Sequence, residues 1–279
     1  MIGSSTRRDA LDRLRSGIAQ LTSSDAWRAW LCVQARFQSY PFSNAILIRC
    51  HCPTASRVAG FGTWRRLGRQ VLRGQQAIWM LAPVTRRVQA DDDPEQSTRV
   101  VAAFRPVPVF DVAQTTGDDL PEICTRLPGD DPLGAYAALV EFASTIGFTV
   151  HDHAFGVDKN GDCSHATRCI RVEVSLAPAH RVKTLAHELG HALLHAELTE
   201  RGLMELEAES VAFVVCEALG IQSDDWAFGY IAGWSGGSDA AVVAIKTAGT
   251  RIQQTAERIL SALELPDRDG AEPPGVEEA

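Results

Sequence analysis

The sequence predicts an α+β protein of two domains, and three observations lead to this prediction. With 279 residues and 45% hydrophobic content, the chain can form one large core or two ordinary ones. Residues 1–90 contain 14 arginines and three aspartates, which give a charge of +11. Residues 91–279 have a charge of −19, so the whole chain has a net charge of −8. Mixed helix and strand signals fill the basic half, and long helical patterns dominate after residue 177. A charge division of this kind indicates two domains with different partners.

The first domain is predicted at residues 1–120. Its expected elements are two helices within 5–38 separated by TSSD, a helix through 44–49, a short helix around Trp64, and strands at 77–81 and 98–112. Between the strands, residues 86–98 form a polar segment that we expect in a hairpin or loop. The prolines of the second strand suggest the edge of a sheet.

A proline- and acid-rich linker is predicted at 121–132, followed by a second domain at 133–262. The expected elements of this domain are a helix over 132–147, strands at 151–155 and 169–174, a hairpin turn DKNGD at 158–162, and helices at 178–196, 200–219 and 237–262. Residues 263–279 form an acidic, proline-bearing tail that we expect to be disordered.

Cysteine usage and hydropathy favour an intracellular protein. The seven cysteines are odd in number and follow no disulfide framework, so we expect reduced thiols. Neither Cys50-His51-Cys52 nor the group of Cys163, His165 and Cys169 has the usual spacing of a zinc site. The chain has no basic-then-apolar leader and no apolar run of about 20 residues. We therefore expect a soluble, cytoplasmic protein without a membrane partner.

The stretch KTLAHELGHALLH, residues 183–195, contains the pattern HExxH. His187 and His191 are four residues apart on a predicted helix, so they share one face and can bind one tetrahedral cation. Glu188 flanks the first histidine, where it can reach a water molecule at the metal and act as general base. The alternative is a buried helix whose histidines are only packed in a core, and the acidic residues downstream favour the metal site.

A catalytic zinc ion prefers three protein ligands and one open position. If the two long helices on either side of Leu198 pair antiparallel, His191 faces Glu205 and His187 faces Glu209. Glu205 is then the expected third ligand. Glu209 is placed to accept a hydrogen bond from the distal nitrogen of His187.

Other polar residues near the motif are weaker candidates. Glu207 is rotated by about 200° from Glu205 around the helix and should point elsewhere. Glu197 and Glu200 lie in the turn between the helices, and we interpret His195 as structural. Several divalent ions can occupy a site of two histidines and one glutamate, and zinc is the expected one.

KTLAHELGHALLH and the downstream ELEAESVAF at 205–213 resemble zinc metallopeptidases of the ImmA/IrrE type. They are still more similar to the carboxy-terminal zincin domain of ArdC-type antirestriction proteins. The resemblance covers about residues 132–220 and implies a zincin-like metallopeptidase domain. It also implies His187, His191 and Glu205 as Zn²⁺ ligands and Glu188 as the base. Where the ImmA/IrrE pattern usually has asparagine, this chain has Glu209, as in the ArdC-like version.

Residues 37–84 mix aromatic rings with arginines. Bases of single-stranded DNA can stack on such rings while arginines hold the phosphates, at roughly 1–3 kcal/mol per stacked base. The alternative is that most of these rings build the core of a small domain. The candidate DNA contacts are Arg36, Tyr40, Phe42, Asn44, Arg49, Arg57, Trp64, Arg65, Arg66, Arg69 and Arg73.

This half of the chain resembles the amino-terminal single-stranded-DNA-binding domain of ArdC-type proteins. The matching motifs are YxFxN at 40–44, AGFxxW at 59–64, GRxVxxGxxAI at 68–78 and VFDVAQTTG at 109–117. The match covers about residues 22–117 and departs at Pro41, where serine is expected. The resemblance implies an arginine-rich α+β module that binds single-stranded DNA without strong sequence preference.

The two resemblances together imply a single-stranded-DNA-binding protein with a zinc metallopeptidase domain, associated with antirestriction or a mobile element. One alternative is a metalloprotease that senses damaged or entering DNA and cleaves a repressor. Another is a DNA-binding protein whose zinc is purely structural, and a third is binding of RNA or duplex DNA. The protein substrate of the peptidase and the oligomeric state are not predicted.

Overall fold

The computed structural model describes residues 2–90, 93–118, 120, 134–155, 159–197, 200–221, 226, 228 and 238–263. The predicted linker at 121–132 lies outside the described residues, as does the predicted tail beyond residue 263. Helices and both parallel and antiparallel strand pairs are present, which confirms the α+β class. Among the described residues, no helix has both the length and the apolar composition needed to cross a membrane.

The chain divides into two compact units, and their boundaries differ from the predicted domains. The first unit contains the described parts of residues 1–17 and 43–121, and the second contains those of 18–42 and 122–268. Residues 18–42 were predicted within the first domain. They group with the second unit because α2 (Ser24–Arg36) buries its apolar face there against α7 (Arg201–Leu219).

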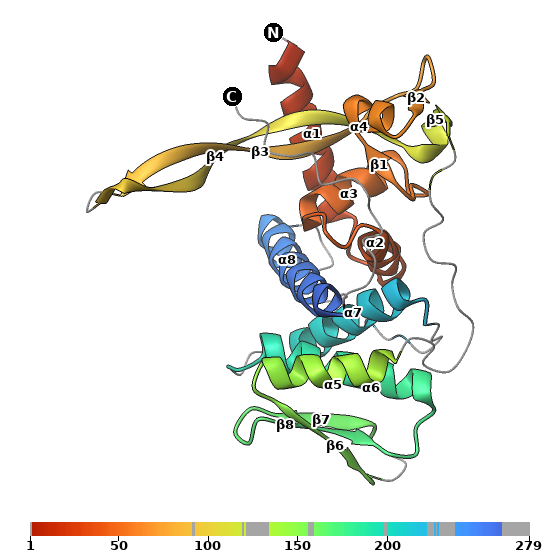
Figure 1. The fold of residues 1–279 in the computed structure, drawn as a ribbon, viewed down its shortest axis with the longest axis vertical. Helices are drawn as coiled ribbons and strands as arrows, with labels where there is room; N and C mark the ends of the chain where they lie inside the picture. The colour runs from red at the N-terminus through yellow and green to blue at the C-terminus, as the bar shows by residue number, and fades with distance from the viewer. Residues whose placement is uncertain are drawn as a thin grey trace. The chain divides into compact units, whose positions relative to one another are not determined.

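The first unit is built around two long antiparallel strands, which Figure 1 shows as a twisted ribbon. Its elements are α1 (Ile2–Ala19) up to residue 17, α3 (Phe42–His51) from residue 43, β1 (Val58–Ala59), α4 (Phe61–Arg66), β2 (Arg69–Val71), β3 (Ile78–Ala90), β4 (Asp93–Asp111), a short 3-10 helix (Val112–Gln114) and β5 (Thr115–Gly117). β4 pairs with β3 and β1, and β2 pairs with β5. The strand predicted at 77–81 is thus longer than expected, and β3 and β4 together include most of the polar segment 86–98.

Trp64 is the centre of a small core in the first unit. Its side chain is 0% exposed and packs with Ala59 and Phe110, and its indole Nε1 donates a hydrogen bond to the Phe110 carbonyl at 2.9 Å. Asn44 connects α3 to β3 in the same unit. Its side-chain amide donates to the Leu81 carbonyl at 3.1 Å, and its Oδ1 accepts from the Leu81 amide at 2.9 Å.

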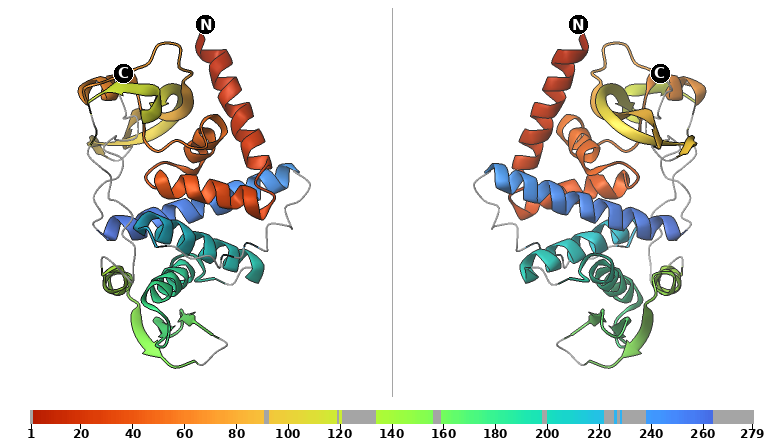
Figure 2. Two further views of the ribbon diagram at one scale, coloured as in Figure 1. Left: turned by 90° about the vertical axis from the view of Figure 1, so that its right-hand side faces the viewer. Right: turned by 90° about the vertical axis from the view of Figure 1, so that its left-hand side faces the viewer.

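The second unit places a helical layer against a small sheet. Its remaining elements are α5 (Ala135–Thr145), β6 (Thr149–His153), β7 (Gly161–Ser164), β8 (Cys169–Glu173), α6 (Pro178–Leu194) and α8 (Asp239–Ala262). The sheet has the order β6-β8-β7, with α5 and α6 on one of its faces (Figure 1). α7 lies between α6 and α8, as Figure 2 shows. Because α7 has neighbours on several sides, most of its residues are apolar and buried.

The hairpin turn predicted at DKNGD is wrong. Gly161 is the first residue of β7, and the antiparallel partner β8 is reached through residues 165–168, where Arg168 has a φ of 52°. Gly161 is required here for close contact with α6. A Cβ at this position would lie 2.7 Å from the Thr184 side chain and 3.1 Å from a Glu188 carboxylate oxygen.

The contact between α6 and α7 depends on the glycine of HELGH. A Cβ added to Gly190 would lie 3.0 Å from the Cα of Ala208 and 3.4 Å from its Cβ. Two small residues therefore allow the helix backbones to approach closely at this point. This approach sets the separation between side chains on the facing surfaces of the two helices.

Replacing Gly190 with valine should therefore destabilise the second unit. Inserting a branched side chain into a packed contact costs about 1–3 kcal/mol, so thermal unfolding followed by circular dichroism should show a midpoint several degrees lower. Gly62→Ala is a control, because a Cβ there meets nothing within 4 Å and α4 gains a better helix former. Equal stability of Gly190→Val and the wild type would contradict the close-contact interpretation.

Candidate functional site

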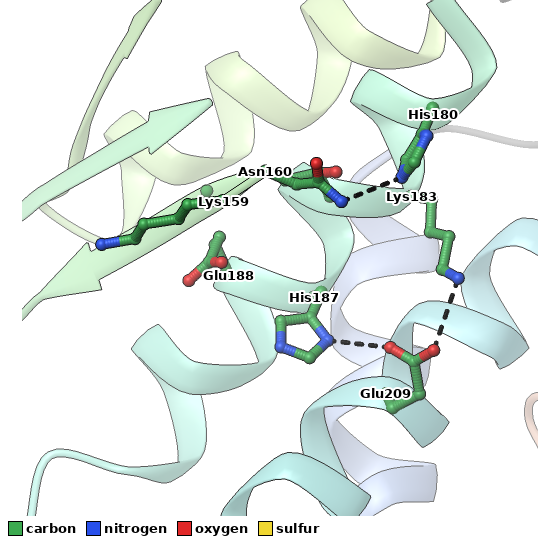
Figure 3. A pocket seen from close by; sticks show the side chains of 9 residues that line it. Lys159, Asn160, His180, Lys183, His187, Glu188 and Glu209 are labelled. Carbon is green, nitrogen blue, oxygen red and sulfur yellow. Dashed lines mark hydrogen bonds and ion pairs between the residues drawn. The ribbon is translucent and has the colours of Figure 1, made fainter. Parts of the chain in front are cut away.

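The predicted metal-binding side chains line and border a pocket at the surface of α6. The pocket has a volume of about 460 Å³. It is lined by Lys159, Asn160, Gly161, His180, Lys183, Thr184, His187, Glu188 and Glu209. Figure 3 shows His187 between the carboxylates of Glu188 and Glu209. The start of β7 and one face of α6 thus form the walls of the pocket, with Glu209 contributed by α7.

Three donor atoms from α6 and α7 converge beside this pocket. Nε2 of His187 lies 3.1 Å from Nε2 of His191. The Glu205 Oε2 lies 3.4 Å from the first nitrogen and 3.7 Å from the second. Ligand atoms about 2.1 Å from a tetrahedral ion are about 3.4 Å from one another. The donor set therefore fits a divalent cation, and the described part of the chain contains no second such group of His, Cys, Asp or Glu side chains.

The Nδ1 atoms of His187 and His191 form hydrogen bonds to side chains that are not among the three converging donors. Nδ1 of His187 donates to the Glu209 carboxylate at 3.0 Å, and Lys183 Nζ lies 3.4 Å from the other oxygen of Glu209. Nδ1 of His191 lies 2.9 Å from Nδ1 of His195. When each Nδ1 carries the hydrogen of a neutral ring, each Nε2 presents a lone pair to the common point. This is the arrangement that a cation requires of its imidazole ligands.

The carboxylates determine the electrostatics of the cluster. Burial alone lowers the pKa of His187, but the Glu205 and Glu209 carboxylates outweigh it and raise the pKa to about 9. Interactions with the neighbouring His187 and His191 rings hold the pKa of Glu205 well below its usual range. Burial raises the pKa of Glu209, but His187 and Lys183 together lower it overall. The site therefore concentrates negative charge, which favours a bound cation.

Glu188 differs from the other carboxylates because it is desolvated. Its side chain is buried, and burial raises its pKa although His187 and His191 lie nearby. It faces the pocket from the same helix as His187 (Figure 3). The neighbouring Cys163 thiol is also affected by burial and by the charge of Glu188, which raise its pKa to about 12. That thiol is therefore protonated at neutral pH.

A buried polar group next to the cluster was not predicted from the sequence. His195 Nε2 donates to Glu207 Oε2 at 3.0 Å, and Arg251 of α8 approaches the same oxygen at 3.3 Å. Glu207 points away from the donor atoms, as its rotation around the helix predicts. In the sequence, the spacing of four residues between His191 and His195 indicated that these two rings could be in contact. Nothing local in the sequence indicated Arg251.

Several predicted DNA contacts are buried in this structure. Tyr40 and Phe42 are each 1% exposed, Trp64 is 0% exposed, and Asn44 is 5% exposed. Phe42 itself belongs to the second unit, where it packs against Trp30 and the backbone of Gly249. Each of these side chains is buried within its own unit, so the three rings present no face to solvent. The prediction that they contact bases is therefore corrected.

The arginines predicted to contact DNA differ in their exposure to solvent. Arg65, Arg66 and Arg73 are exposed, whereas Arg36, Arg49, Arg57 and Arg69 are half-buried. Arg69 has a structural use, since its guanidinium donates to the Thr115 hydroxyl at 2.8 Å and to the Asp118 carbonyl. One aromatic ring that was absent from the predicted contacts is exposed beside these arginines. Phe61 on α4 is 57% exposed, with its ring centroid 4.5 Å from that of the buried Phe110.

Two family models match separate parts of the chain. Residues 13–110 match the N-terminal domain of anti-restriction factor ArdC, and residues 146–216 match the IrrE N-terminal-like domain, a peptidase family. These two matches confirm the two resemblances found in the sequence.

Two solved structures of the antirestriction ArdC protein from plasmid R388 are similar to this chain. The metal-free structure has a TM-score of 0.52 and 19% identity, and the match covers 79% of this chain and 84% of that one. The Mn(II)-bound structure has a TM-score of 0.57 and 18% identity, with coverage of 90% and 98%. At this level of identity the similarity shows a shared fold. A search of curated proteins gave no significant match.

Removal of the Glu205 carboxylate should weaken metal binding strongly. Glu205→Gln replaces a charged donor atom with a neutral one, and we expect a loss greater than the roughly 10–100-fold that accompanies loss of a hydrogen-bonding partner of a ligand. Competition titration with a chelating dye, using Zn²⁺ and Mn²⁺ in turn, measures this loss. Glu200→Gln, at the start of the same helix, is the matched control and should bind normally. Undiminished affinity in Glu205→Gln would rule out a ligand role.

Proposed function

We propose that this protein binds single-stranded DNA through its arginine-rich half and hydrolyses a peptide bond at a zinc site in its second half. The peptidase proposal rests on one observation above the others: His187, His191 and Glu205 converge on a common point, with the buried Glu188 beside them. The ArdC-type N-terminal match supports the DNA-binding proposal. The proposed setting is antirestriction or the transfer of a mobile element, in the cytoplasm.

The donor set supports zinc over other divalent ions. Two imidazoles and one carboxylate are a common ligand set for catalytic zinc, whereas Mn²⁺ is better suited to sites richer in oxygen. A zinc ion bound there would supply a Lewis acid that polarises a water molecule and the scissile carbonyl. Glu209 fixes the ring of His187 through the 3.0 Å hydrogen bond to Nδ1.

Glu188 is the proposed general base. Its carboxylate is buried at the pocket, and its raised pKa brings it closer to neutral pH. A carboxylate in this state can take a proton from the attacking water and later return it to the leaving amine. The absence of a side chain at Gly161 leaves space beside the carboxylate, since a Cβ would lie 3.1 Å from Oε1. The proposed substrate is an unidentified protein segment that enters this pocket.

Phe61 and its neighbouring arginines are the proposed DNA surface of the first unit. Phe61 and Arg65 are one turn apart on α4, so they share a face, and Arg66 adds a further exposed charge. An exposed ring can stack on a base of any sequence, and arginines beside it can hold the phosphates. This surface supports binding with weak sequence preference.

Glu188→Gln should lower the rate of peptide hydrolysis by about 100-fold or more, because general-base catalysis typically contributes 10²–10⁴-fold. Zinc affinity should remain close to that of the wild type, since Glu188 is not among the converging donors. Release of fluorescent fragments from a labelled unfolded protein measures the rate, and Glu197→Gln is an exposed control. A variant that hydrolyses peptides at the full rate would disprove the assigned role.

The same variant separates the alternatives in cells. Protection of incoming DNA from restriction should be lost in Glu188→Gln if hydrolysis is required. A variant that folds, binds DNA and keeps full protection would favour a DNA-binding protein with a structural metal.

Phe61→Ala should weaken binding of an oligothymidylate by about 1–3 kcal/mol, the usual contribution of one stacked base. Arg65→Gln and Arg66→Gln should each reduce the dependence of affinity on salt concentration, because fewer counterions are released. Fluorescence anisotropy of the full chain at two salt concentrations measures both effects. Leu72→Ala is the control, since Leu72 is 41% exposed but has no ring. Unchanged binding by a folded Phe61→Ala variant would exclude the proposed surface.

A further inference from the structure

A chain of polar groups leads away from His191, and the proposed steps of hydrolysis do not by themselves explain it. The His195 side chain is 0% exposed and the Glu207 side chain is 1% exposed, and the two are joined by a 3.0 Å hydrogen bond. Charged or ionisable groups are seldom buried to this extent unless they are paired. Here the pairing connects α6 to α7, and Arg251 extends it to α8.

The directions of these hydrogen bonds follow from the chemistry of the groups. The Glu207 carboxylate accepts from His195 Nε2, and Arg251 Nη2 approaches the same oxygen at 3.3 Å. A neutral imidazole with its hydrogen on Nε2 has only an acceptor at Nδ1. The Nδ1 of His191, 2.9 Å away, must then be the donor. His191 consequently keeps its own Nε2 unprotonated, and this is the atom directed at Glu205 and His187.

The backbone explains how His195 reaches this position. His195 is the C-cap residue that directly follows α6, with a φ of −122°, and its amide still donates to the His191 carbonyl at 3.0 Å. Its ring therefore lies over the preceding turn, against the ring of His191 at a centroid distance of 5.0 Å. Arg251 also donates to the Leu194 carbonyl at 2.8 Å, which fixes the end of α6 against α8.

We propose that His195 and Glu207, held in place by Arg251, are positioning residues that fix the tautomer and ring orientation of His191 for binding a divalent cation through Nε2. The two histidines are thus held by different means. His187 donates directly to the Glu209 carboxylate, whereas His191 reaches a carboxylate through a second imidazole. The inference rests on the proposed metal site and extends it to three further residues on three helices.

His195→Phe removes the acceptor for His191 while it retains an aromatic ring of similar size. We expect the affinity of the full chain for Zn²⁺ to fall by about 10–100-fold, as is typical when the hydrogen-bonding partner of a ligand is lost. His195→Gln can accept with its carbonyl and donate with its amide, so we expect it to restore part of this loss. His165→Phe is the matched control, because His165 contacts the Ala192 carbonyl of the same helix and no predicted ligand.

Three measurements distinguish the outcomes. Thermal unfolding of the metal-free variants reports on stability, and a purely structural role would lower the midpoint without changing the zinc affinity of the folded protein. Equal affinities of wild type and His195→Phe would overturn the positioning role alone. Failure of the wild type to bind Zn²⁺ would overturn the metal site and the positioning role together.

A measurement on the wild type does not depend on the variants folding. Long-range ¹H–¹⁵N spectra of the histidine rings distinguish a hydrogen on Nδ1 from one on Nε2. In the zinc-loaded protein we expect His191 to carry its hydrogen on Nδ1 and His195 to carry its hydrogen on Nε2. The opposite tautomer at His195 would overturn the proposal.

Discussion

The close approach of α6 and α7 at Gly190 and Ala208 is the constraint on which the candidate site depends. A Cβ at Gly190 would lie only 3.0 Å from the Cα of Ala208, so the helices can come this close only with small residues at the contact. Donors of a tetrahedral ion must lie about 3.4 Å apart. His191 on α6 and Glu205 on α7 reach such a separation, 3.7 Å, because the backbones between them nearly touch.

The cluster combines polar groups in two environments. Glu205 keeps a side chain that is 52% exposed, so a cation, water or substrate can approach it. Glu207 and His195 are almost fully buried, and each has a partner for its polar atoms. Burial of a paired network restricts the motion of the rings that it holds, whereas an exposed ligand leaves the site open. This division suits a centre that must be both preorganised and accessible.

The arginine-rich half shows how composition alone overestimates the number of aromatic rings that a binding surface can present. Its aromatic residues are numerous, but Trp64 and Phe42 are buried in the cores of their units. A small domain needs large apolar side chains of this kind to exclude water from its core. Phe61 remains outside on the same short helix as Trp64, three residues earlier. The charge division led to the proposal of a polyanionic partner, and burial determined which ring is exposed to solvent.

The sequence by itself determined the α+β class, the HExxH helix and the convergence of residues 187, 191, 205 and 209, because the helical period and the antiparallel pairing of neighbouring helices are local consequences of spacing. Tertiary structure alone decided that α2 groups with the second unit, that β7 starts at Gly161, and that Arg251 reaches Glu207. Such contacts join residues distant in the chain, and no local pattern encodes their distance or burial.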